Sequence, residues 1–174
     1  MKSWARQVKL RDRGRVTSRG DATHLLMAPG DYVLVHREVL RLLVMVCPDG
    51  CGETVVVNLD EDAGPAWTVY LRTSGLSIYP SVWRETGCQS HFIIWDDRAI
   101  LFRADEGAVS DAEVDALLLE RVAERLRART SVSFRDLAIE LEEVPWAVLE
   151  ACDALVKAGR ARRGRKRGTY TPSD

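Results

Sequence analysis

The chain has 174 residues, an apolar fraction of 46% and a formal net charge of −1, values that are ordinary for a soluble globular protein of one or two domains. No apolar run approaches the roughly 20 residues of a membrane span, and the first residues lack the pattern of a signal peptide, so we expect a cytoplasmic protein without membrane contact. In a reducing compartment its four cysteines favour metal ligands, nucleophiles or buried thiols over disulfides.

The first 28 residues are strongly basic. Between residues 2 and 19 the only acid is Asp12, and the basic residues are Lys2, Arg6, Lys9, Arg11, Arg13, Arg15 and Arg19. Because apolar periodicity is weak here, residues 1–28 are predicted to form an extended N-terminal arm. Such an arm is either a solvated tail or a segment that binds a polyanion.

From Pro29 onward, short runs of β-branched and large apolar residues alternate with turn signals at glycine, proline and aspartate. Strands are predicted over residues 32–36, 39–46, 54–59, 67–71, 76–79, 91–95 and 99–102. Many short strands with turn signals about every 8 to 12 residues indicate a compact sheet structure. Residues 29–105 are therefore predicted to be a small all-β module.

Two turns of this module carry soft metal ligands. Cys47-Pro-Asp-Gly-Cys51 is followed much later by Cys88-Gln-Ser-His91. Together, Cys-x3-Cys and Cys-x2-His have the number and type of ligands of a closed structural zinc site. We therefore predict a structural Zn²⁺ bound by Cys47, Cys51, Cys88 and His91, with no catalytic residue. A structural zinc can supply on the order of 10 kcal/mol of folding free energy to so small a module.

Other interpretations of these residues stay open. The four residues could be buried thiols and a core histidine. Cys88 could instead be a nucleophile with His91 as its base, but two further cysteines would then lack a role and no orienting Asn or Asp is evident. His36-Arg-Glu38 matches the His-x-Glu of zinc deaminases, yet the Pro-Cys-x-x-Cys partner motif is not matched, so we interpret His36 as an exposed edge residue.

A composition shift near Asp105 marks a domain boundary, after which the apolar residues follow a helical period. Ser110 and Glu113 form a capping box that opens a helix over residues 111–127. Further helices are predicted over residues 134–141, capped by Ser133, and 146–158. Residues 160–163 and 168–171 then pair as a short hairpin.

Three helices followed by a hairpin resemble a winged helix-turn-helix domain over residues 110–174. The predicted fold class is therefore α+β, with an all-β zinc-clipped module followed by this winged helix. The basic residues of the hairpin, or wing, are Arg160, Arg162, Arg163, Arg165, Lys166 and Arg167. They could neutralise DNA phosphates. The helix that would read bases carries Glu150 and Asp153 and no arginine, so a winged helix that holds protein is also open.

Several motifs of the β module resemble those of a known family. They are Pro29-Gly-Asp-Tyr-Val-Leu, Cys47-Pro-Asp-Gly-Cys-Gly-Glu, Val57-Asn-Leu-Asp60, Gly64-Pro-Ala-Trp67, Tyr79-Pro-Ser-Val-Trp83 and Gly87-Cys-Gln-Ser-His-Phe-Ile-Ile94. Over residues 28–103 the chain resembles an uncharacterised bacterial family, a domain of unknown function numbered six-five-two-seven, whose members tend to be encoded near ubiquitin-like conjugation genes. The resemblance implies zinc ligation and an E1-like, E2-like or ubiquitin-like protein as partner.

On this basis we expect a non-catalytic, zinc-stabilised adaptor of a bacterial ubiquitin-like conjugation pathway. It would act as an E3-like bridge between a conjugation enzyme and a target, by raising their effective concentration. The alternative is a DNA-binding winged-helix regulator that grips phosphates with its wing and arm. A cysteine-dependent hydrolase ranks last.

Overall fold

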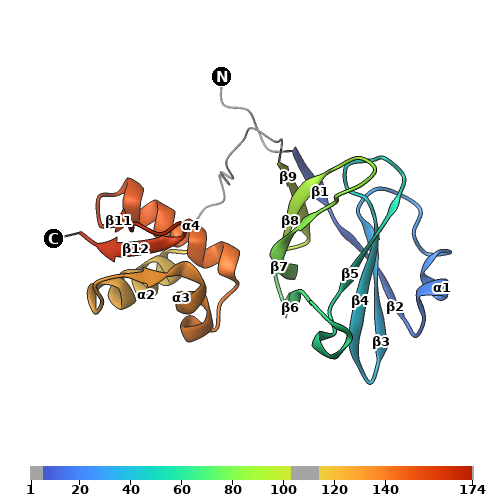
Figure 1. The fold of residues 1–174 in the computed structure, drawn as a ribbon, viewed down its shortest axis with the longest axis horizontal. Helices are drawn as coiled ribbons and strands as arrows, with labels where there is room; N and C mark the ends of the chain where they lie inside the picture. Colours follow the sequence, from blue (N-terminus) through green and yellow to red (C-terminus); the bar gives the residue numbers. More distant parts are fainter. Residues whose placement is uncertain (1–5, 103–113, 174) are drawn as a thin grey trace. The chain divides into compact units, whose positions relative to one another are not determined.

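The computed structural model describes residues 6–102 and 114–173. The chain divides into two compact units, residues 1–109 and residues 110–174 (Figure 1). The structure is a mixture of helices and sheets in which sheets dominate the first unit. Within the described residues, none of the helices has the length and apolar character that a membrane crossing requires.

The first sheet of the N-terminal unit has the strand order β1-β9-β8-β7-β6. Its strands are β1 (Arg6–Lys9), β6 (Thr68–Arg72), β7 (Gly75–Trp83), β8 (His91–Trp95) and β9 (Arg98–Phe102). All neighbouring strands are antiparallel. Strands β6 to β9 form a meander, and β1 joins the sheet beside β9.

The second sheet has the strand order β2-β3-β4-β5. Its strands are β2 (Arg11–Val16), β3 (Asp31–Arg37), β4 (Val39–Val46) and β5 (Thr54–Asn58). Strand β2 runs parallel to β3, whereas the other neighbours are antiparallel. The short helix α1 (Arg19–Ala22) connects β2 to β3, and the 3-10 turn η1 (Glu61–Ala63) follows β5.

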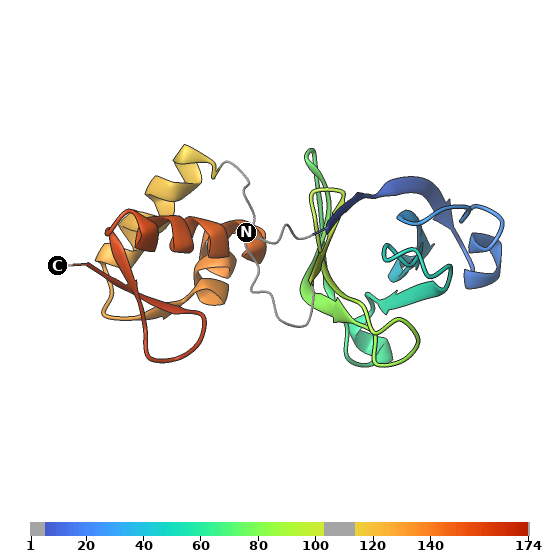
Figure 2. The ribbon, with the colours of Figure 1, turned by 90° about the horizontal axis from the view of Figure 1, so that it is seen from above.

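The two sheets face each other, as Figure 2 shows, and bury one apolar core between them. Leu43 and Val57 of the second sheet belong to the same buried cluster as Ile78 and Phe92 of the first. The inward side chains alternate with outward ones along each strand, as expected when one face of a sheet is buried. The N-terminal unit is therefore a β-sandwich.

Strand β3 is buried on both faces. Its inward residue Leu34 lies in the main core, while Val33 and Val35 belong to a second cluster on the outer face, with Ala22 of α1 and Val44 of β4. This double burial explains why the strand reads as a continuous apolar run instead of an alternating one.

The basic N-terminal segment is part of both sheets. The sequence predicts an extended arm over residues 1–28, whereas the structure places residues 6–22 in β1, β2 and α1. The chain crosses between the sheets at Leu10, which is buried and whose N–H donates to the Asp97 carbonyl at 2.7 Å. Both strands lie at sheet edges, where charged side chains remain in water, and for this reason their sequence lacks an apolar alternation.

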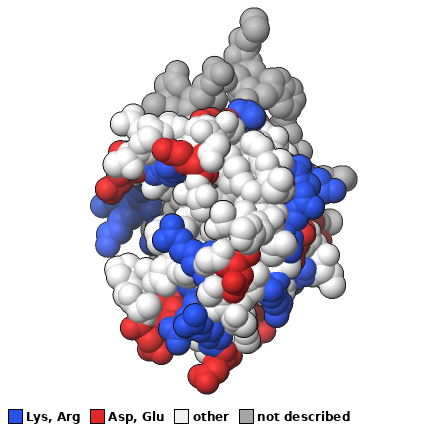
Figure 3. All heavy atoms as spheres, turned by 90° about the vertical axis from the view of Figure 1, so that its right-hand side faces the viewer, with Lys and Arg blue, Asp and Glu red and all other residues white. Residues whose placement is uncertain are grey.

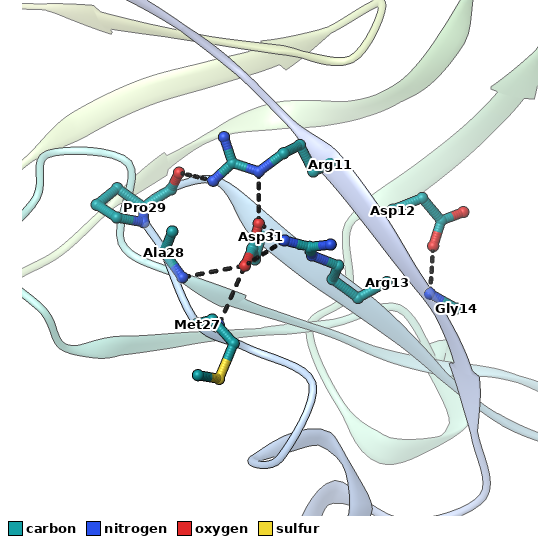
Figure 4. Close-up of polar contacts among 8 residues, drawn as sticks. All are labelled: Arg11, Asp12, Arg13, Gly14, Met27, Ala28, Pro29 and Asp31. Carbon is teal, nitrogen blue, oxygen red and sulfur yellow. Dashed lines mark hydrogen bonds and ion pairs between the residues drawn. The ribbon is translucent and has the colours of Figure 1, made fainter.

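Asp31 anchors the junction of β2 and β3 (Figure 4). Its carboxylate is fully buried and accepts hydrogen bonds from Arg11 Nε at 2.6 Å and Arg13 Nη2 at 3.2 Å. The backbone N–H groups of Met27 and Ala28 donate to it at 3.1 Å and 3.0 Å. Burial alone would raise the pKa of Asp31, but these four donors outweigh it and hold the pKa well below its usual range.

The C-terminal unit contains three helices and a small sheet. The elements are α2 (Ala116–Arg127), β10 (Val132–Ser133), α3 (Phe134–Leu141), α4 (Pro145–Lys157), β11 (Ala161–Arg163) and β12 (Thr169–Pro172). The sheet order is β10-β12-β11. Leu126, Leu137, Val148 and Leu155 are buried within this unit. Helices α3 and α4 and the β11–β12 hairpin correspond closely to the ranges predicted from sequence, whereas α2 begins at Ala116, after its cap residue Asp115, and not at residue 111 as predicted.

Side-chain caps determine where two of these helices begin. The Asp115 carboxylate accepts from the N–H groups of Leu117 and Leu118, and the Ser133 hydroxyl accepts from the Asp136 N–H at 3.1 Å. The Ser133 cap agrees with the sequence prediction. The predicted capping box at residues 110 and 113 lies outside the described residues.

Candidate metal centre

Three cysteines from two loops of the β-sandwich lie together. Cys47 directly follows β4, Cys51 lies in the loop before β5, and Cys88 lies in the loop between β7 and β8. Their sulfur atoms all lie within 4.8 Å of one another, and those of Cys47 and Cys88 are 3.7 Å apart. A Zn–S bond of about 2.3 Å in a tetrahedral site places two sulfurs roughly 3.8 Å apart. The three thiols therefore fit a soft metal ion such as zinc.

The backbone of the Cys47–Cys51 turn brings two of these thiols together. The Cys47 N–H donates to the Glu53 carbonyl at 2.8 Å, and the Gly50 N–H donates to the Cys47 carbonyl at 3.1 Å. Gly50 and Gly52 have φ angles of 91° and 80°, a region that glycine occupies without steric cost. Because the chain doubles back in this way, Cys51 returns to the side of the turn where Cys47 lies, directly after β4.

An arginine contacts the thiol cluster. Arg84 Nη1 donates to the Cys51 sulfur at 3.3 Å and to the Cys88 sulfur at 3.1 Å, and its Nη2 is paired with the Glu53 carboxylate. Ligand spacing gave no reason to select Arg84. The position of Arg84 in the sequence could nevertheless have indicated its role. A cation four residues before Cys88 can balance the negative charge that thiolate ligands accumulate.

A serine also contacts the cluster. Ser90 Oγ lies 3.3 Å from the Cys88 sulfur and 3.5 Å from the Cys47 sulfur, and the residue is 9% exposed. In the sequence it is one of the two residues between Cys88 and His91. A hydroxyl enclosed between two sulfurs was not predictable from the spacing of the ligands alone.

The protonation of the cluster depends on burial and on these neighbours. Burial raises the pKa of the Cys47 thiol. Burial also disfavours the thiolate of Cys88, but hydrogen bonds from Ser90, together with those to Cys51 and Cys47, lower the pKa of Cys88 to about 7. The Glu53 carboxylate raises the pKa of Arg84, so the guanidinium remains charged beside the sulfurs.

His91 lies apart from the three thiols. It begins β8, and its exposed ring packs between Trp83, with centroids 6.4 Å apart, and Phe102, at 5.2 Å. Burial against these rings lowers the pKa of His91. The structure thus brings together three of the four predicted ligands. A metal held by these thiols would take its fourth ligand from outside this group, such as a water molecule.

The basic residues of the C-terminal hairpin are partly neutralised. Arg160 makes two hydrogen bonds to the Glu120 carboxylate, at 2.8 Å and 2.9 Å, and Arg163 pairs with Asp153 at 3.2 Å. Arg162, Arg165, Lys166 and Arg167 are exposed. DNA binding through this wing stays a prediction.

The fold and the site together define a β-sandwich with a three-thiol cluster, joined to a helical unit. Residues 19–102 match the model of a family described as "Bacterial ubiquitination-like system serine protease (BubE)". The match agrees with the predicted link to bacterial ubiquitin-like conjugation, but its description names a protease where the sequence predicts an adaptor, and it lends no support to DNA binding. No curated protein and no solved structure matches the chain.

Proposed function

We propose that this chain is a serine hydrolase of a bacterial ubiquitination-like system, with Ser90 as its nucleophile. The observation that carries the proposal is the family match over residues 19–102, which runs from α1 to β9 and includes the three clustered cysteines. The substrate class is then a ubiquitin-like protein joined through its C-terminus to a peptide extension or a target.

Ser90 is the serine of the matched range whose hydroxyl lies at the thiol cluster. A serine hydroxyl becomes a nucleophile when its surroundings favour loss of the proton or stabilise the negative oxygen. Positive charge is close by, because the Arg84 guanidinium contacts the same Cys88 sulfur that lies 3.3 Å from Ser90 Oγ. A zinc ion held by Cys47, Cys51 and Cys88 would offset most of the negative charge of their thiolates and would act as a Lewis acid beside the hydroxyl.

The proposal is tested with a fluorophosphonate probe, which labels activated serines, and with the system's own ubiquitin-like protein carrying a short C-terminal extension. The wild-type chain is expected to be labelled and to release the extension. Ser90→Ala should lose both activities by at least about 100-fold. Ser81→Ala is the matched control, because Ser81 lies in β7 and its backbone carbonyl, not its side chain, accepts from Trp67.

Labelling and cleavage by Ser90→Ala at the wild-type rate would remove Ser90 from this role. Equal losses of labelling and cleavage in Ser90→Ala and Ser81→Ala would indicate a general effect on the fold. Tandem mass spectrometry of a digest of the labelled chain identifies the modified residue directly.

The second proposed function is the non-catalytic adaptor, with the C-terminal unit as a winged helix that holds a second protein. The observation that favours it is the division into two units, each with its own buried core. Two separate binding units can bring two partners to a high effective concentration without any chemistry.

The two functions are distinguished by a tagged pull-down from the native host with nuclease treatment. A wild-type chain that shows neither labelling nor cleavage, but retains an E1-like or E2-like protein after nuclease, supports the adaptor. A catalytically active chain supports the hydrolase, whatever proteins accompany it.

A further inference from the structure

A cavity of about 430 Å³ lies on the outer face of the second sheet. One wall is the connection from β2 to α1, including Thr17 and Arg19, and the opposite wall is the end of β5 and η1, including Asp60. Its floor lies over the end of β3 and the start of β4. Cys47, by contrast, follows the end of β4, so the cavity and the thiol cluster belong to opposite ends of that strand.

The register of the strands explains how the floor forms. Val35 of β3 pairs with Leu42 of β4, which in turn pairs with Asn58 of β5. Residues paired in this way present their side chains on one face of a sheet. Val35 and Leu42 therefore form an apolar floor that continues the cluster beneath α1.

Three arginines line this cavity: Arg19, Arg37 and Arg41. Figure 3 shows basic side chains spread over the face that includes α1 and β2, with a hollow between them. Arg41 is paired with Asp60 at 2.7 Å, so these two charges offset each other. Arg37 and Arg19 then give the cavity an excess of positive charge.

These two arginines have donor groups to offer a ligand. Arg37 uses its Nε to donate to the Thr17 carbonyl at 2.6 Å, which orients the guanidinium. Within residues 6–102 and 114–173, no partner is found for the terminal nitrogens of Arg37 or for the guanidinium of Arg19. A guanidinium that is already oriented loses less side-chain entropy on binding an anion.

We infer that this cavity binds a carboxylate carried on a short apolar segment, such as the last residues of a polypeptide or an acidic residue beside aliphatic ones. The planar fork of arginine matches the two oxygens of a carboxylate, and Val35 and Leu42 offer an apolar contact for the rest of the ligand. The inference requires neither the thiol cluster nor Ser90.

The test is a titration of the full chain, labelled with ¹⁵N, against three peptides. The first is acetyl-Leu-Val-Leu with a free carboxylate, the second is the same peptide as its amide, and the third is acetyl-Leu-Val-Glu-amide. The free acid is expected to shift the backbone signals of the cavity residues and to bind at least about tenfold more tightly than the amide. Binding of the third peptide would identify a side-chain carboxylate as an equally suitable source.

Two substitutions assign the binding to the cavity. Arg19→Gln and Arg37→Gln should each weaken binding of the free acid by about tenfold. Arg98→Gln is the matched control, since it removes an exposed arginine from the other sheet and should leave the affinity unchanged. Arg19 is exposed, so we expect Arg19→Gln to keep the fold. That variant shows whether the peptide binds in the cavity even if Arg37→Gln unfolds.

The inference is overturned if the acid and the amide bind equally, or if millimolar peptide produces no shifts. An equal loss of affinity in Arg98→Gln and Arg19→Gln would show nonspecific attraction. Tighter binding of inorganic phosphate than of the acid would also overturn it. None of these results depends on hydrolysis, so a failure here is separate from a failure of the proposed hydrolase.

Discussion

The Asp31 carboxylate is fully buried and accepts four hydrogen bonds. Two come from the side chains of β2 and two from the backbone just before β3, so the carboxylate ties these two segments together. Asp31→Asn would remove the charge that the two arginines face and would present an amide group to the backbone N–H donors. We expect the free energy of unfolding of the β-sandwich to fall by about 3 kcal/mol, measured by urea denaturation. The exposed Asp62→Asn is the control and should change it little. A neutral effect of Asp31→Asn would show that the carboxylate is not needed.

The same carboxylate makes stability depend on pH. Its folded pKa lies below the unfolded value of about 3.9, so its contribution is complete above that value and is lost as the pH falls toward the folded pKa. The difference in urea midpoint between wild type and Asp31→Asn should therefore be largest near pH 7 and shrink from about pH 5 downward. A difference that grows on acidification would contradict this sign.

The three clustered cysteines of the candidate metal centre were predictable, but their neighbours were not. Two short turns rich in cysteine identify Cys47, Cys51 and Cys88 as a group, since few other arrangements use such spacing in a small β-rich unit. His91 separates from them because packing against Trp83 and Phe102 decides where its ring lies. Arg84 and Ser90 reach the thiols through a loop whose path depends on tertiary structure.

At the level of elements, the two cysteine loops belong to different sheets. Cys47 follows β4 of the second sheet, and Cys88 precedes β8 of the first sheet. A metal bound there would link the sheets. We expect Cys88→Ser, or treatment with a chelator, to release the metal and to destabilise the β-sandwich by several kcal/mol, measured as metal content by mass spectrometry and as thermal unfolding. Unchanged metal content in Cys88→Ser would refute the site.

Two controls sharpen this experiment. Cys152→Ala changes a thiol that is buried in α4, whose pKa burial raises to about 12, and should leave the metal content unchanged. His91→Ala should also retain the metal, because the ring packs away from the sulfurs. Loss of metal from His91→Ala would instead support the four-ligand set predicted from sequence.

The strands from β3 to β9 could be predicted because each is a short run rich in β-branched or large apolar residues that is bounded by turn residues. Strands β1 and β2 could not, since Arg6–Lys9 and Arg11–Val16 are mostly exposed and carry no such period. The caps and periods of the helices gave ranges close to α3 and α4. The cavity with Arg19, Arg37 and Arg41 depends on strand register, which sequence patterns do not specify.

For the whole molecule, two separate cores predict two unfolding transitions by calorimetry. Leu43→Ala and Leu137→Ala form a matched pair, because each deletes a fully buried leucine from a different unit. Each should cost about 2 to 5 kcal/mol and lower only one of the two transition temperatures. A single transition, or a shift of both by either variant, would show that the units unfold together.

The crossing of the chain at Leu10 means that one short basic segment closes an edge of each sheet. Behind it lie β9 and β3, whose backbone N–H and C=O groups would otherwise be open to pairing with another molecule. Arginines and lysine along such a border repel an incoming identical strand. We expect this charged border to oppose self-association through the sheet edges, so a chain shortened past Val16 should aggregate more readily than the full chain, as measured by light scattering.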